Sequence, residues 1–401
     1  VELLAALFRG ITTKAITRLI FVGDVFQLPP IGPGRPFLDI LRWLRREHPN
    51  CIAELETCMR VESVDGEEMV SSGLRLAAGY RDESGPGDDE IIARAARSQN
   101  LGDLSLLAWK DHDDLLDKID QALGLIGIAP DDRAAFDLSL GISTKDWKQS
   151  ESWQILTPTR IHAFGATEIN RVIHDRYRAR EIANATNPNG QWPGPMGDQG
   201  IVNRDKVMQV INQPKWLPKD SDGLHFVANG EIGLVTQSWK RKTKDDFDKV
   251  FVAFSTQPNA EYRYRKSEVK ESLELAYALT VHKAQGSDFG TAVVILPRKA
   301  ATLSRELLYT ALTRFRDRLV VLVERDTAVL DQMRNPIYSE TARRSTFMFD
   351  LLIGDNAGDL HLPDRYRPEG LIHRAQDGTP MRSKSEVIVY EVLKGLGLQP
   401  V

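Results

Sequence analysis

Short apolar runs that end in polar loops and alternate with amphipathic stretches dominate this sequence. Three of them are Arg18–Val22, Trp153–Leu156 and Thr291–Leu296. Continuous apolar runs of this length, bounded by turn residues, are typical of strands buried on both faces of a parallel sheet. Parallel strands need helical crossovers, so the alternation predicts an α/β fold.

The middle of the chain follows a different pattern. Residues 184–200 are rich in turn residues, and Asn229–Gly230 further along is a strong hairpin signal. Several short strands within about seventy residues predict a small β-barrel inserted into the α/β unit, over about residues 201–270. The expected strands are Lys206–Val210, Ile232–Val235, Val250–Phe254 and Arg263–Tyr264.

Length and composition limit the class of protein. The chain has 401 residues, of which 42% are hydrophobic, so two or more domains with large cores are expected. Lys and Arg number 52 against 56 Asp and Glu, and this net charge of −4 excludes a disordered or histone-like protein. It does not exclude nucleic-acid binding, because a basic groove can coexist with acidic outer faces.

Cysteine usage and hydropathy indicate the compartment. Cys51 and Cys58 cannot form a disulfide framework, and no Cys/His cluster at zinc-finger spacing surrounds them. No apolar run approaches the roughly 18 to 20 residues that span a bilayer. We therefore expect a soluble, cytoplasmic protein with no membrane partner and no metal held by this segment.

Asp24 and Gln27 are the first candidate site residues. They lie in Gly23-Asp-Val-Phe-Gln-Leu-Pro-Pro30, directly after the first apolar run. Open α/β sheets bind ligands at the carboxyl ends of their strands, and an amide there can contact both a phosphate oxygen and an attacking water. The alternative is a polar turn held by the two prolines.

Two more motifs lie near the end of the α/β pattern. Val281-His-Lys-Ala-Gln-Gly-Ser-Asp288 follows a predicted strand, and Leu307-Leu-Tyr-Thr-Ala-Leu-Thr-Arg314 lies on a predicted helix with one apolar face. Together with Gly23–Pro30, and in this order, they resemble motifs III, V and VI of superfamily 1 helicases, most closely the RecD-like, 5′ to 3′ branch. The segment that includes Lys206-Val-Met-Gln and Asn229-Gly-Glu-Ile-Gly-Leu-Val235 is similar to the inserted Src-homology-type barrel of that branch.

The resemblance covers about residues 1–325 and implies a RecA-like P-loop NTPase helicase fold. Residues 1–53 would be the C-terminal part of an incomplete first motor domain. Residues 54–330 would be a second motor domain that contains the barrel, followed by a linker over 331–380.

The resemblance also implies roles in ATP hydrolysis. Gln27 would sense the γ-phosphate, Arg60 matches the motif IV arginine, and Arg314 matches the motif VI arginine finger; these are the implied catalytic residues. Guanidinium suits this role because it is always charged and offers forked donors to phosphoryl oxygens. For Arg60 the alternative is a surface arginine after a strand. The implied ATP-binding residues are Asp24, Gln27, Gly286, Asp288 and Arg314.

A surface for single-stranded DNA is implied on loops of the second domain. Hydroxyls and cations there bind backbone phosphates without reading sequence. For His282 the alternative to DNA binding is an ordinary histidine on a loop. The implied DNA-binding residues are Thr157, Arg160, Thr280, His282 and Lys283.

The chain does not contain every motif of such a motor. ATP and Mg²⁺ require a Gly-rich loop with Lys-Ser/Thr and a paired Asp-Glu, yet Gly-Lys-Thr and Gly-Lys-Ser are absent and no paired acids end a strand before Gly23. The sequence also begins at Val1 without a Met. We therefore expect a truncated segment that is inactive by itself and binds ATP and Mg²⁺ only together with a preceding part.

The C-terminal end carries a separate resemblance. Arg382-Ser-Lys-Ser-Glu386, which enters a predicted helix over Ser385–Lys394, resembles the opening of PD-(D/E)xK nuclease domains. Residues 381–401 would then begin such a domain, with Glu386 assisting metal binding. The alternative is a helix cap at Ser383 or Ser385.

The function that the resemblance implies is ATP-dependent DNA unwinding or translocation, 5′ to 3′ on single-stranded DNA. Two alternatives stay open: a non-catalytic single-strand-binding module that lost its phosphate-binding loop, and the motor part of a helicase–nuclease fusion. The sequence identifies neither protein partners nor the pathway, whether DNA repair, conjugation or phage defence.

Overall fold

The computed structural model describes residues 2–11, 16–55, 61–64, 67–81, 90–98, 100–216, 224–240, 248–344, 373–381 and 384–395. The chain divides into two compact units. Cys58–Asn335 form one, which we call the sheet unit, and Val1–Thr57 with Pro336–Val401 form the other, the terminal unit. The domain boundaries predicted from the sequence stay predictions.

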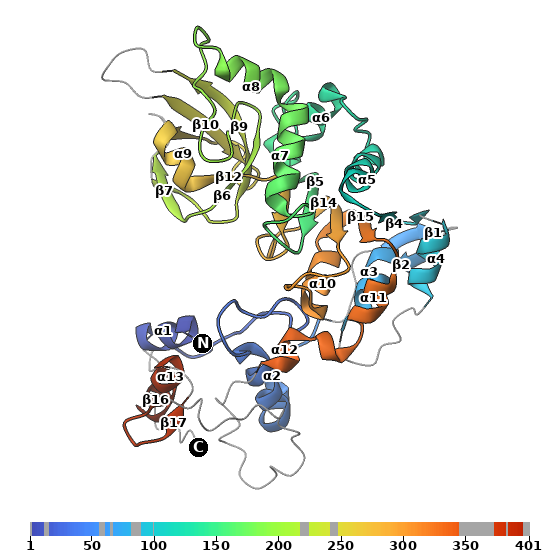
Figure 1. Ribbon diagram of the computed structural model, residues 1–401. Coiled ribbons are helices and arrows are strands. Elements are labelled where there is room, and N and C mark those ends of the chain that lie inside the picture. The colour runs from blue at the N-terminus through green and yellow to red at the C-terminus, as the bar shows by residue number, and fades with distance from the viewer. Residues whose placement is uncertain are drawn as a thin grey trace. The chain divides into compact units, whose positions relative to one another are not determined.

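The sheet unit is built around a six-stranded sheet that is parallel except at one edge (Figure 1). The strand order is β13-β5-β14-β15-β4-β3, and β3 with β4 is its antiparallel pair. All of β14 is buried, as its mostly apolar sequence predicts. The predicted α/β class is therefore confirmed. The strands are β3 (Asn100–Leu101), β4 (Leu104–Trp109), β5 (Trp153–Thr157), β13 (Ala278–Thr280), β14 (Phe289–Leu296) and β15 (Phe315–Glu324).

Helices cover both faces of this sheet because successive strand residues point to opposite sides. Val320 faces a core that includes Ile119 of α5 and Ile169 of α7. Its neighbour Leu319 faces the other side, where a Cβ on Gly73 of α3 would lie 3.3 Å from the Leu319 Cβ. The helices of this unit are α3 (Ser72–Ala78), α4 (Ile91–Ser98), α5 (His112–Gly124), α6 (Arg133–Ser139), α7 (Ala166–Tyr177), α8 (Ala179–Thr186), α9 (Lys266–Ser272), α10 (Arg305–Leu312) and α11 (Ala328–Met333).

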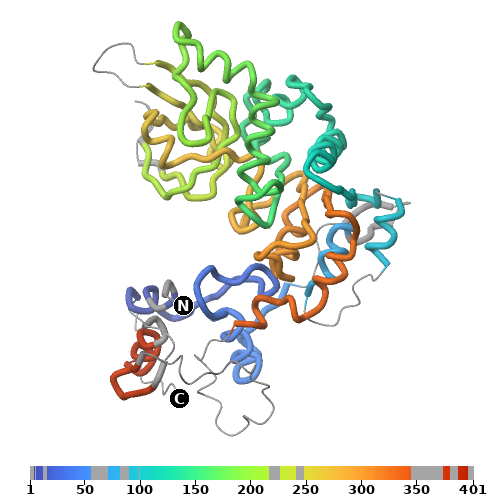
Figure 2. Tube along the Cα trace, viewed as in Figure 1, coloured from blue at the N-terminus to red at the C-terminus, as the bar shows by residue number. Residues whose placement is uncertain are grey.

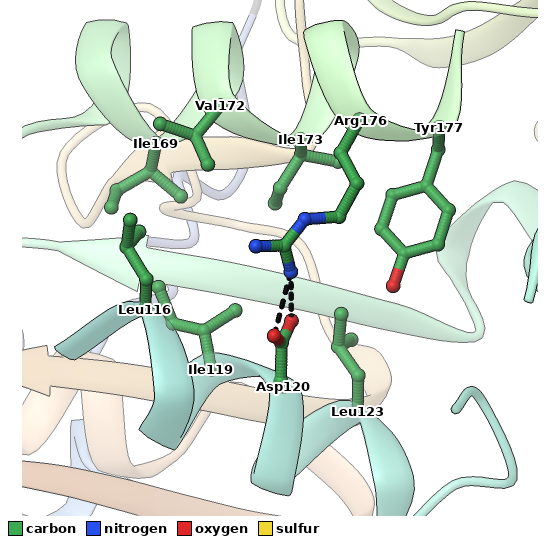
Figure 3. Close-up of a pocket in the computed structure, with 9 residues that line it drawn as sticks. All are labelled: Leu116, Ile119, Asp120, Leu123, Ile169, Val172, Ile173, Arg176 and Tyr177. Carbon is green, nitrogen blue, oxygen red and sulfur yellow. Dashed lines mark hydrogen bonds and ion pairs between the residues drawn. The ribbon is translucent and has the colours of Figure 1, made fainter. Parts of the chain in front are cut away.

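The contact between α5 and α7 fixes the helix that follows β5 (Figure 3). Apolar side chains such as Ile119 and Ile173 fill the space between the two helices. At its rim, Arg176 Nη1 lies 2.5 and 2.6 Å from the carboxylate oxygens of Asp120. The amphipathic pattern of α7 is thus satisfied against α5 and the sheet.

Five antiparallel strands form a second, inserted sheet in the order β11-β10-β9-β6-β12. This confirms a block of short strands, while their closure into a barrel stays a prediction. Asn229 and Gly230 connect β8 to β9, but β8 pairs with β7 and β9 pairs with β6 and β10, so the predicted hairpin is wrong. The strands are β6 (Lys206–Gln209), β7 (Gln213–Trp216), β8 (Leu224–Val227), β9 (Ile232–Trp239), β10 (Lys249–Phe254), β11 (Glu261–Arg265) and β12 (Leu273–Leu275).

The two sheets share one hydrophobic core. A buried lysine lies where they meet: Lys206 of β6 is fully buried and donates from Nζ to the carbonyl of Trp153 on β5 at 2.7 Å. Its Nζ also lies 4.9 Å from the centroid of the Trp153 ring. Burial lowers the pKa of Lys206 to about 7, an effect that the charge of Glu151 partly offsets.

The terminal unit departs from the sequence-based expectation. Arg18–Val22 is not a strand, and the exposed fractions of Ile20 and Val22 are 72% and 92%. Among the described strands none pairs with this segment, so its backbone gains no sheet hydrogen bonds. The unit contains α1 (Glu2–Gly10), α2 (Pro36–Glu47), α12 (Glu340–Arg343), β16 (His373–Arg374), β17 (Pro380–Met381) and α13 (Lys384–Gly395).

Much of the predicted linker, residues 345–372, lies outside the described residues. The expected helix near the C-terminus is confirmed as α13. In the described ranges, no helix has both the length and the apolar character needed to cross a membrane.

We predict that Lys206→Met changes how stability depends on pH. Between pH 7 and about 10 the unfolded chain holds a proton on Lys206 that the folded chain releases, so the wild-type free energy of unfolding rises with pH. The variant lacks this titration. The stability of the variant relative to wild type should therefore be greatest at pH 6 and should fall towards pH 9, by up to about 1.4 kcal/mol per pH unit.

Thermal or urea unfolding at both pH values measures this difference. Lys110→Met, at an exposed position, is the control. A difference between Lys206→Met and wild type that does not change with pH would contradict the prediction.

Candidate functional site

Two loops that carry predicted DNA-binding residues lie side by side. β13 pairs in parallel with β5, with Thr280 opposite Thr157, so both strands end at the same edge of the sheet. The backbone N–H of Val281 donates to the Thr157 carbonyl at 3.0 Å and extends the pairing. The loops after Thr157 and Thr280 are therefore neighbours (Figure 2).

Three of the predicted residues line one pocket at this edge: Arg160, Thr280 and Lys283. Glu274 of β12 joins two of them. Arg160 Nη2 lies 3.1 Å from Glu274 Oε1, and Lys283 Nζ lies 2.8 Å from Glu274 Oε2. The predicted cations thus converge, as a site for an anionic strand requires, and they do so around a carboxylate.

Asn170 of α7 holds the strands behind this pocket. It is 3% exposed, its Nδ2 donates to the carbonyls of Leu275 at 3.1 Å and Ala278 at 2.8 Å, and its Oδ1 accepts from the Ala278 N–H at 2.8 Å. Gln199 Oε1 also accepts from the Leu275 N–H, at 2.6 Å. Polar side chains therefore hold the backbone directly after Glu274.

Sequence reasoning missed both Asn170 and Glu274. Asn170 lies in the apolar stripe of α7, one residue after Ile169 and three before Ile173. A polar residue at such a position is a usable signal, since a buried amide needs partners. Glu274 has no comparable signal, because its role depends on loops distant in the sequence.

The structure corrects the role predicted for Thr157. Its side chain is fully buried, and its hydroxyl donates to the Phe164 carbonyl at 2.7 Å. Thr157 thus shapes the loop after β5 instead of facing a ligand. Thr280 Oγ1 accepts from the Lys283 N–H at 3.4 Å, and His282 is exposed on the same loop.

Arg314 lies between α10 and β15, and its side chain is 8% exposed. Its Nη1 donates to the carbonyl of Ser287 at 3.1 Å, and its Nε donates to the carbonyl of Thr310 at 3.0 Å. The structure therefore joins the two motifs that end at Asp288 and Arg314, which are separate in the sequence.

Gly286 and Asp288 lie in the loop that Arg314 contacts. Gly286 has φ +89, and a Cβ there would meet nothing within 4 Å, so the backbone angle, not space, favours glycine. Asp288 is about half exposed and lies 3.5 Å from Arg316 Nη1. Its carboxylate is accessible to a ligand.

Asp24 and Gln27 form a compact turn in the terminal unit. Asp24 Oδ1 accepts from the Phe26 N–H at 3.0 Å, and Gln27 Nε2 donates to Asp24 Oδ2 at 3.2 Å. Arg344 Nη1 holds the following loop by donating to the carbonyl of Gly32 at 2.7 Å. Arg60 and the Glu386 side chain lie outside the described residues.

We predict that Asn170→Ala destabilises the sheet unit. Its loss leaves the buried carbonyls of Leu275 and Ala278 without the Asn170 donor, at a cost of about 1–3 kcal/mol. A thermal melt of the chain should shift to lower temperature, whereas Asn184→Ala at an exposed position of α8 should not shift it. Equal melting of Asn170→Ala and wild type would show that Asn170 does not hold these strands.

Known proteins similar to this chain agree with the motifs. Residues 275–322 match the family described as UvrD-like helicase C-terminal domain. The chain is 28% identical over 383 residues to the uncharacterized protein MJ1519 of Methanocaldococcus jannaschii, covering 87% of this chain and 30% of that protein. It is 26% identical over 302 residues to an ATP-dependent RecD2 DNA helicase of Deinococcus radiodurans, covering 75% of this chain and 32% of that protein.

The chain thus spans about a third of the length of these curated relatives. Among solved structures, a Pif1 helicase from Candida albicans matches 77% of this chain and 66% of that chain, with 15% identity and a TM-score of 0.33. That score is low, so the fold rests on the strand order described above. The predicted relationship to superfamily 1 helicases is confirmed. The nuclease-like continuation stays a prediction.

Proposed function

We propose that this chain forms part of the motor of an ATP-dependent superfamily 1 DNA helicase. We also propose that the pocket at the ends of β5 and β13 binds the backbone of single-stranded DNA. The observation that carries the proposal is the convergence of Arg160, Thr280 and Lys283 on one pocket. These residues come from two segments more than a hundred positions apart in the sequence. The match over residues 275–322 supports the same interpretation.

The chemistry of this edge suits a nucleic-acid backbone. Arg160 and Lys283 supply positive charge. Thr280, at the end of β13, and His282, on the loop after it, add hydrogen-bonding groups. Such groups bind phosphates without reading bases, which a motor that moves along any sequence requires. The 5′ to 3′ direction is part of the proposal and follows from the RecD-like resemblance.

Arg314 is proposed as the arginine finger for ATP, with Gln27 and Arg60 as its partners in catalysis. Its guanidinium, bonded to the Ser287 carbonyl in this structure, would exchange that acceptor for phosphoryl oxygens. Asp24, Gly286 and Asp288 complete the proposed nucleotide set. ATP and Mg²⁺ would bind only with a phosphate-binding loop, which this sequence does not contain.

The DNA surface is tested with Lys283→Ala in the 401-residue chain. Loss of one phosphate contact should weaken binding of a dye-labelled oligothymidylate and reduce the slope of log affinity against log salt by about 0.7, measured by fluorescence anisotropy. Lys148→Ala is the control, because Lys148 is exposed and lies before the start of β5, whereas the proposed DNA surface lies after its end. An unchanged slope for Lys283→Ala would remove Lys283 from the DNA surface.

The ATP site is tested with Arg314→Ala in the full-length enzyme. ATP turnover should fall on the order of 10³-fold or more, because the transition-state charge loses its guanidinium donor. Arg314→Lys should recover only part of the rate, since ammonium lacks the forked donors. Nucleotide-free DNA binding should persist in both variants, and turnover within a few-fold of wild type would exclude the finger role.

The non-catalytic alternative predicts a different result for the same enzyme. If the chain belongs to a single-strand-binding module, the protein that contains it binds oligothymidylate but hydrolyses no ATP. The 401-residue chain alone should hydrolyse none in either case, so only the longer protein separates the two functions.

A further inference from the structure

One carboxylate occupies the position where the two loop cations converge. Glu274 contributes a separate oxygen to each partner, Oε1 to Arg160 at 3.1 Å and Oε2 to Lys283 at 2.8 Å. The three residues belong to three elements: Glu274 to β12 of the inserted sheet, Arg160 to the loop after β5, and Lys283 to the loop after β13. A bridging anion with two oxygens is also what a backbone phosphodiester would present to these cations.

We propose that Glu274 is a built-in competitor of strand phosphates: it neutralises Arg160 and Lys283 in the free protein and is displaced when single-stranded DNA binds. This inference rests on the proposed DNA-binding function and adds to it the regulation of affinity at that site.

The ion pairs are too exposed to be needed for the fold. The exposed fractions of the side chains are 59% for Arg160, 33% for Lys283 and 25% for Glu274. Pairs at such exposure contribute little stability, typically about 0–1 kcal/mol, because water and salt screen them. The backbone directly after Glu274 is held instead by the buried amide of Asn170 and by Gln199, which both bond to Leu275.

The rest of the pocket leaves a phosphate few other donors. The backbone N–H groups of Ala166 and Thr167, at the start of α7, already donate to the carbonyls of Thr159 and Arg160 at 3.0 Å each. The start of this helix therefore does not offer those two amides to an anion. A phosphate would bind through the side-chain cations, and thus in place of Glu274.

Such a competitor suits a protein that must release the strand as often as it binds it. Each cation exchanges one anionic partner for another, so binding gains less free energy than it would from cations in water. Fewer counterions are also released, since part of the cationic charge is already neutralised, and the salt dependence becomes shallower. Affinity is thereby limited without loss of the contacts that position the strand.

Glu274→Gln in the 401-residue chain tests the proposal. The amide keeps the size of the side chain but removes the charge that competes for the cations. Affinity for dye-labelled oligothymidylate at low salt should rise roughly two- to five-fold, the range that the loss of an exposed ion pair allows. The slope of log affinity against log salt should become steeper, by at most about 0.7 for each of the two cations, because no carboxylate charge then offsets their neutralisation of the bound phosphates.

The matched control is Glu271→Gln. Glu271 is exposed, lies three residues from Glu274, and is outside the pocket lining. This substitution changes the net charge by the same amount as Glu274→Gln. A similar gain in affinity from Glu271→Gln would therefore assign the effect to general charge and overturn the competitor role. Glu274→Asp, which keeps the charge on a shorter side chain, should give an intermediate affinity and serves as the test if Glu274→Gln does not fold.

A double-mutant cycle assigns the gain to the two cations. In an Arg160→Ala, Lys283→Ala background, Glu274→Gln should have no effect on affinity. If Lys283→Ala weakens binding while Glu274→Gln binds as wild type or more weakly, the competitor role is wrong and the DNA surface stands. If wild type and all variants fail to bind the strand, the proposed function fails and this inference with it.

Discussion

The passage of the chain from one sheet to the other, over Ala276 and Tyr277, determines the geometry of the candidate site. This two-residue link joins the last strand of the inserted sheet to the edge strand of the parallel sheet. Gln154, fully buried on β5, donates from Nε2 to the carbonyls of Ala276 at 2.9 Å and Tyr277 at 3.0 Å. Because both carbonyls are fixed, Glu274 before the link and Lys283 after it cannot move far apart.

Buried polar groups extend this link into the core between the sheets. The Tyr277 hydroxyl donates to Asp205 Oδ1 at 2.8 Å, and burial keeps the pKa of that hydroxyl well above its usual value, so it stays a donor. Nearby, Arg178 is fully buried and donates to Asp137 Oδ1 at 2.6 Å. Buried groups of this kind are costly unless paired, which favours one arrangement of the two sheets over others.

The sequence predicted which segments form strands and helices better than it predicted which segments they contact. The strands β5 and β14 could be predicted from short, mostly apolar runs, because a strand buried on both faces needs them. Arg18–Val22 has the same pattern yet forms no strand, since a run specifies burial only if neighbouring strands supply hydrogen bonds. The motifs predict Lys283 and Arg314 as site residues, whereas the contacts of Glu274 and the burial of Thr157 depend on distant segments, which local patterns do not encode.

The loop Val281–Asp288 is held near both ends by charged side chains. Lys283 is paired with Glu274 of the inserted sheet, and the Ser287 carbonyl accepts from Arg314 after α10. In the proposed mechanism a strand phosphate takes Lys283 from Glu274, and a γ-phosphate takes Arg314 from Ser287. Both exchanges would act on the same eight-residue loop. If one exchange shifts the conformation of this loop, it changes the free energy of the other, and by linkage the effect on binding is reciprocal. Coupling between nucleotide and DNA in this motor would then need no long pathway, only the rigidity of the few residues between Lys283 and Ser287.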